Sequence, residues 1–123
     1  MLKKISLHIL AALFILAGFN HFRSPLPYME IIPPSFPNPA LLNLLAGGAE
    51  ILLGILLLIP STRKFAAIGI LLLLVAFIPV HIFMIQKGGC TGKYFCIPNW
   101  LAWARLFPLQ FILIYWAWWV RKV

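Results

Sequence analysis

The sequence predicts an all-α polytopic membrane protein, a bundle of four transmembrane helices. Of its 123 residues, 63% are hydrophobic and 10% are charged, whereas a soluble domain is normally about one quarter charged. Four apolar runs are each long enough for a spanning helix, which needs about 20 residues. At this length we expect residues 1–123 to form a single membrane domain.

The first apolar run covers about residues 5–22 and follows Lys3 and Lys4. No small-residue cleavage site follows its apolar core, so we predict a retained helix rather than a signal peptide. The second, third and fourth predicted helices cover about residues 40–59, 65–85 and 100–119. Tryptophan side chains near the ends of the fourth helix are typical of anchors at the membrane–water interface.

Lysine and arginine side chains gather at the ends of these runs, and they set the predicted orientation. With four crossings, six of these cations share the side of the two termini, and three lie on the other side. Because cytoplasmic segments carry the excess of Lys and Arg, we predict cytoplasmic N- and C-termini and an inner (plasma) membrane location. The dispersed placement also excludes a nucleic-acid-binding stripe, despite a net charge of +8. The six are Lys3, Lys4, Arg63, Lys64, Arg121 and Lys122, and the three are Arg23, Lys87 and Lys93.

The first outward loop, residues 23–39, contains six prolines. Proline fixes φ and lacks an N–H, so we expect neither helix nor strand there. The loop also carries apolar side chains such as Tyr28 and Phe36. It is therefore either a lid folded over the bundle or a loop that rests among lipid headgroups.

The second outward loop, residues 86–99, holds both cysteines of the chain, Cys90 and Cys96. We place this loop in the periplasm or outside the cell, where conditions are oxidising, so the pair is a candidate disulfide that closes a small ring. A redox-active pair, free thiols and a metal site remain alternatives. The loop has neither a C-x-x-C motif nor a histidine, so zinc binding is disfavoured.

Ionisable side chains inside a spanning helix are costly, and they often mark a functional site. The predicted helices contain His21, Glu50, His81 and Arg105, together with the neutral polar residues Asn20, Asn43 and Gln110. At a rise of about 1.5 Å per residue, the four ionisable groups lie between the outer surface and the midplane. This shared depth predicts one ligand or proton site that opens outward beneath the proline-rich loop.

Small residues indicate that Glu50 faces the inside of the bundle. Gly47 and Gly54 lie on the same helix face as Glu50, and small residues on one face allow close helix packing. A similar stripe on the first helix consists of Ala11, Gly18 and His21.

Charge balance predicts an ion pair between Glu50 and Arg105, with Glu30 as a rival partner, because an unpaired buried ion is costly. Two alternatives remain for the cluster as a whole: it only holds the helices together, or it binds a metal ion.

Internal prolines, Pro79 and Pro108, should also free one carbonyl each in the third and fourth helices. The carbonyls are those of Val75 and Ala104, and the available donors are Arg105 and Gln110.

Five motifs follow one another along the chain: Ala17–Phe22, Pro27-Tyr28 with Ile32-Pro33 and Phe36-Pro37, Gly47–Glu50 with Gly54, Ile78–His81, and Arg105–Gln110. Their order resembles that of the DoxX family over nearly the whole chain. The resemblance implies a four-helix bacterial membrane protein that is associated with quinone-coupled sulfur oxidation or membrane oxidoreductase complexes. It also implies that the polar set His21, Glu50, His81, Arg105 and Gln110 is the functional one. The cysteine pair is less typical of that family.

These observations predict a small subunit of a membrane redox system that binds a quinone-like or other amphiphilic ligand. The alternatives are a non-enzymatic binder or transporter of a small amphiphile, and a structural partner for other membrane proteins. A quinone is the one cofactor suggested, and no metal is assigned. Because the chain lacks haem, nucleotide and iron–sulfur motifs, it is at most an oxidoreductase subunit. Electrons would come from a membrane or periplasmic partner protein, or from Cys90 and Cys96.

Overall fold

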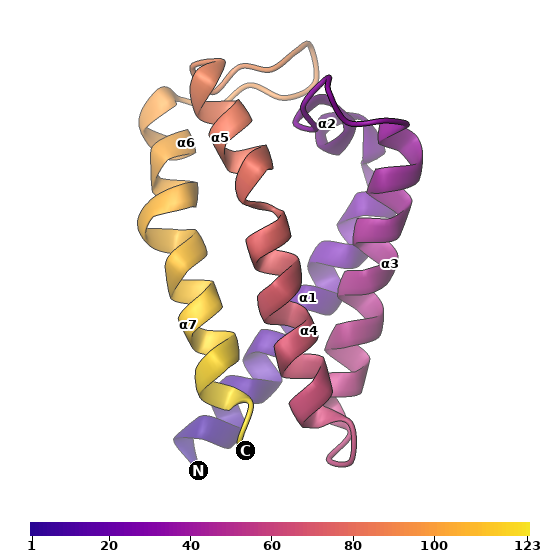
Figure 1. Cartoon of the computed structure of the whole chain (residues 1–123), viewed down its shortest axis with the longest axis vertical. Coiled ribbons are helices and arrows are strands. Elements are labelled where there is room, and N and C mark those ends of the chain that lie inside the picture. Colours follow the sequence, from indigo (N-terminus) through magenta and orange to yellow (C-terminus); the bar gives the residue numbers. More distant parts are fainter.

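The computed structural model describes all 123 residues, and it is all-helical, without a β-strand. Both termini and the turn after the second span lie at one end of the bundle (Figure 1). The predicted all-α class and the four long apolar helices are confirmed, with small shifts at their ends. The helices long and apolar enough to cross a membrane are Leu2–Arg23, Pro39–Leu58, Arg63–Gln86 and Asn99–Val120.

The first two spans are uninterrupted helices, α1 (Leu2–Arg23) and α3 (Pro39–Leu58). They approach closely at glycines: a Cβ on Gly18 would lie 2.7 Å from the carbonyl oxygen of Gly47, and one on Gly54 would lie 3.0 Å from that of Ala11. The two predicted small-residue faces therefore pack against each other. Side chains that lie between these glycines on α1 are consequently close enough to contact side chains on α3.

The third span breaks into α4 (Arg63–Ala76) and α5 (Ile78–Gln86), because Pro79 lies in the first turn of α5 and cannot continue α4. Here Gln110 donates a hydrogen bond from Nε2 to the carbonyl oxygen of Leu74 at 2.6 Å. Gln110 does not bond to the carbonyl of Val75, the acceptor that the sequence suggested. Leu74 faces the bundle and is buried, whereas Val75 is exposed.

The fourth span consists of α6 (Asn99–Ala104), a π-helical segment η1 (Arg105–Gln110) and α7 (Phe111–Val120). Phe107 has an extended backbone, with φ −133° and ψ 120°, directly before Pro108. A residue that precedes proline avoids the α region, so the helix is interrupted at this point. The interruption places the side chains of η1 differently from those of a straight helix.

The proline-rich outward loop contains a short helix, α2 (Pro25–Glu30), so the prediction of no helix there is wrong. The first N–H groups of any helix have no acceptor within it, and proline is therefore tolerated in the first turn. Pro25 and Pro27 both lie in that turn. Figure 1 shows α2 beside the α5–α6 loop, at the end of the bundle away from the termini.

Buried apolar side chains concentrate in the half of the bundle that contains the termini. Leu10 and Phe14 of α1, Leu57 of α3 and Ile70 of α4 belong to one core of 11 buried residues. A second, smaller core joins the outward loops to the bundle and contains Ile31, Met84 and Ala102. The space between the two cores holds the polar residues of the helices.

Candidate functional site

A cavity of about 760 Å³ lies among the helices and is roofed by the first outward loop. This volume falls within the range of about 300–1,000 Å³ that is usual for small-molecule sites. Of its 24 lining residues, 18 are hydrophobic, and they come from every span. The other lining residues are His21, Asn43, Glu50, His81, Arg105 and Gln110, so the structure brings all five predicted site residues to one cavity.

The wall formed by α1 and α3 contains a hydrogen-bonded polar pair. The ring of His21 donates from Nδ1 to Oδ1 of Asn43 at 2.7 Å, and Asn43 donates from Nδ2 to the backbone oxygen of His21 at 3.0 Å. On the other edge of the ring, Nε2 of His21 lies 3.5 Å from Oε2 of Glu50. All three side chains are buried, so the imidazole has one fixed orientation in the cavity wall.

The predicted ion pair between Glu50 and Arg105 is wrong, because Glu50 pairs with His21 instead. The close contact of α1 with α3 brings His21 to the carboxylate, whereas Arg105 lies on the fourth span. Arg105 donates from Nη1 to the sulfur of Met84 at 3.9 Å, and its guanidinium lies 5.6 Å from the centre of the Phe95 ring. Its neighbours are thus a thioether and an aromatic face.

Tyr28 of α2 covers the His21 side of the cavity. Its ring stacks on the imidazole of His21 with a centroid distance of 3.9 Å and an angle of 24°. Asn20 donates from Nδ2 to the Tyr28 hydroxyl at 2.6 Å, and Phe36 from the same loop also lines the cavity. This arrangement agrees with the lid interpretation of the proline-rich loop.

Glu30, the last residue of α2, connects this lid to the cysteine loop. Its Oε1 accepts hydrogen bonds from the backbone N–H groups of Tyr94 and Phe95, at 2.8 and 2.9 Å. Glu30 is therefore not the rival partner for Arg105 that the sequence suggested. Cys90 and Cys96, which flank these amides, lie at disulfide-bonding distance, as the candidate disulfide required. The ring that they close presents its N–H groups to the lid.

Two buried polar atoms in the cavity wall have no hydrogen-bond partner in the protein. They are Nδ1 of His81 and Oε2 of Glu50, and both residues are buried. Oε2 of Glu50 lies within ion-pair distance of His21, at 3.5 Å, but accepts no hydrogen bond from it. Buried polar atoms are normally satisfied, and an exception calls for a physical explanation. A bound molecule could satisfy both atoms, by donating a hydrogen bond to Oε2 of Glu50 and by exchanging one with Nδ1 of His81. His21, Glu50 and His81 do not form a group that could hold a metal ion.

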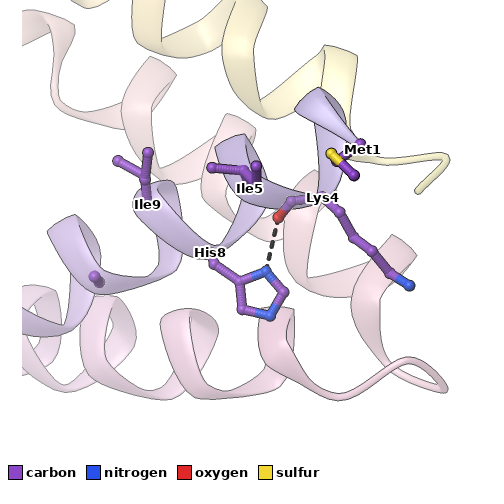
Figure 2. A pocket seen from close by; sticks show the side chains of 6 residues that line it. Met1, Lys4, Ile5, His8 and Ile9 are labelled. Carbon is purple, nitrogen blue, oxygen red and sulfur yellow. Dashed lines mark hydrogen bonds between the residues drawn. The ribbon is translucent and has the colours of Figure 1, made fainter.

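A second hollow lies on one face of α1 near the N-terminus (Figure 2). There, the ring nitrogen Nδ1 of His8 lies 2.7 Å from the backbone oxygen of Lys4. His8 is exposed, and no predicted site residue borders this hollow. It therefore lies apart from the polar cluster.

Sequence reasoning did not place Asn43 or Tyr28 among the site residues, although both contact His21. Asn43 lies seven residues before Glu50, two helical turns away on the same face, and this spacing was a usable signal. Tyr28 had no such signal, because its position depends on how the proline-rich loop folds back over α1.

Comparison with known proteins gives one match. No curated protein matches the chain, and no solved structure matches it. A family model described as a domain of unknown function (DUF8561) matches residues 10–121. This match covers the second, third and fourth long helices, the first long helix from residue 10 onward, and every residue that lines the polar side of the cavity. The chain therefore belongs to the DUF8561 family.

Proposed function

We propose that the four helices span the inner (plasma) membrane, with both termini in the cytoplasm and the cysteine loop on the periplasmic or extracellular side. Large apolar side chains on the outside of the bundle support insertion: Leu16, Leu52, Leu72 and Ile112 are all more than half exposed. Such a surface suits lipid, and would be a large apolar patch in water. The excess of lysine and arginine at the end that holds the termini supports the orientation.

Cysteine labelling in intact cells tests this orientation. Ser35 lies in the proline-rich loop and Ser61 in the turn between α3 and α4, and both are exposed. A membrane-impermeant maleimide should label Ser35→Cys in whole cells, whereas Ser61→Cys should react only after the cells are opened. The native cysteines are paired and do not compete for the reagent. Labelling of Ser61→Cys in intact cells would reverse the proposed orientation.

The cavity supports the binding of an amphiphilic ligand, and we propose that the protein is a small subunit of a membrane redox system that binds a quinone-like or other amphiphilic ligand there. The observation that carries this proposal is a cavity of about 760 Å³ with 18 hydrophobic lining residues and six polar ones. A quinone head needs hydrogen-bonding groups, and its tail needs an apolar slot. The resemblance to DoxX motifs supports the redox setting, in which a membrane or periplasmic partner protein would supply electrons.

Mass spectrometry of molecules that co-purify with the protein in mild detergent separates this proposal from its alternatives. A bound quinone would support the redox subunit. A bound amphiphile without redox chemistry would instead support a binder or transporter. A preparation without any bound amphiphile would contradict both and leave the structural assembly role.

Filling the cavity should abolish this binding. Ala46 of α3 lines the cavity, so Ala46→Phe should place a ring where the ligand lies and remove most of the bound ligand. Leu52→Phe is the matched control, because Leu52 is 57% exposed on the same helix and does not line the cavity. Ligand content per protein, measured by mass spectrometry on folded material, checks the result. Equal ligand content in the two variants would place the ligand elsewhere.

A further inference from the structure

Arg105 is a cation in the cavity wall without a carboxylate partner. Its polar contact is the sulfur of Met84 at 3.9 Å, and a thioether is only a weak acceptor. The Phe95 ring, 5.6 Å away, adds a cation–π contact. Neither neighbour carries a negative charge, although a charge inside a membrane is expensive unless it is compensated.

The chain cannot supply the missing anion from elsewhere. It contains only two acidic residues, and both are engaged: Glu50 lies 3.5 Å from His21, and Glu30 accepts two backbone N–H groups of the cysteine loop. An anion for Arg105 must therefore come from outside the protein. The cavity is the place from which it can reach the guanidinium, because Arg105 lines it.

The surroundings of Arg105 fit an oxyanion head and an apolar chain. His81, on the adjacent helix α5, has a buried Nδ1 without a partner, and it borders the same cavity. From Arg105 towards the termini, the wall is apolar and includes Leu109 and Leu113 of the fourth span and Leu73 of α4. The cavity thus carries a cation at Arg105 and leucine side chains beside it, while His21, Asn43 and Glu50 lie in the wall formed by α1 and α3.

We propose that the ligand of this cavity is an anionic amphiphile, with its oxyanion on Arg105 and its hydrocarbon chain along the leucine-lined wall. This inference rests on the proposed function, because it keeps the amphiphile-binding cavity, but it assigns an anionic head group to the ligand where a quinone-like ligand would have a neutral one. Arginine binds a carboxylate or phosphate through two parallel hydrogen bonds, and such charge-assisted bonds are roughly twice as strong as neutral ones. The anionic head therefore gives the site its selectivity.

The test compares hexadecanoate, hexadecanol and a neutral short-chain ubiquinone on the purified full-length protein in nanodiscs. At alkaline pH the hexadecanoate head is ionised, while its chain length equals that of the alcohol. Hexadecanoate should bind at least about tenfold more tightly than hexadecanol, as a charge-assisted contact replaces a neutral one. Hexadecyl phosphate should share this preference if the natural source is a lipid phosphate, and not if the site is specific for carboxylates.

Substitutions at Arg105 complete the experiment. Arg105→Gln should remove the preference for the anion, and Arg105→Lys should retain part of it. Arg23→Gln is the matched control, because Arg23 is exposed, bonds to Asn20 and does not line the cavity. Hexadecanol or the ubiquinone binding as tightly as hexadecanoate to the unmodified protein would overturn the inference and leave the proposed function intact. Failure of every amphiphile to bind would overturn both.

Discussion

Gly47→Ala is expected to destabilise the protein, although alanine is the better helix former. An added Cβ would lie 2.7 Å from the Cβ of His21 and 3.1 Å from the backbone oxygen of Gly18. Overpacking of this kind costs about 1–3 kcal/mol, whereas the gain in helix propensity is about 1 kcal/mol at most. The midpoint of thermal unfolding in detergent should fall, and ligand binding should weaken because α1 and His21 are displaced.

Gly48→Ala is the matched control for this prediction. Gly48 is the next residue of α3, and a Cβ there would meet nothing within 4 Å. The gain in helix propensity is the same at both positions, so Gly48→Ala should leave stability unchanged or raise it slightly. A parallel decrease for both variants would mean that the contact between α1 and α3 does not limit stability.

Asn43→Ala is expected to destabilise the bundle and to release the His21 ring. The substitution removes both hydrogen bonds that join α1 to α3 in the cavity wall. Hydrogen bonds between membrane helices contribute about 0.6 kcal/mol each on average, and up to about 1.7. The loss should therefore be about 1–3 kcal/mol, measured by denaturation in detergent, and it should be accompanied by weaker ligand binding.

Asn99→Ala tests whether this effect is specific to the cavity wall. Asn99 is the exposed first residue of α6, and a surface substitution of this kind changes stability by less than about 0.5 kcal/mol. A stability loss for Asn43→Ala no larger than that for Asn99→Ala would show that the pair formed by His21 and Asn43 contributes little to holding α1 against α3.

Local sequence was sufficient to predict the spans. A spanning segment must satisfy its own backbone hydrogen bonds, so it is a long apolar helix that hydropathy alone can locate. The two internal prolines, Pro79 and Pro108, were also visible, but the sequence predicted only a freed carbonyl at each and not the interruption of the helix that the structure shows. The same reasoning went wrong in the proline-rich loop, where Pro25 and Pro27 begin α2. The prolines fall in a first turn, and nothing in their number alone indicates that position.

The sequence alone determined the four long apolar helices, the small-residue faces of α1 and α3, and the depth at which polar residues gather. These properties depend on composition and on the helical repeat. Only the tertiary structure decided the partners: Glu50 with His21 rather than Arg105, Glu30 with the cysteine loop, and Tyr28 stacked over His21. Partners depend on distances of a few ångströms between segments far apart in the chain, and these distances follow from helix contacts and breaks. Arg105 is therefore without an acidic partner, which the balance of charges in the sequence did not indicate.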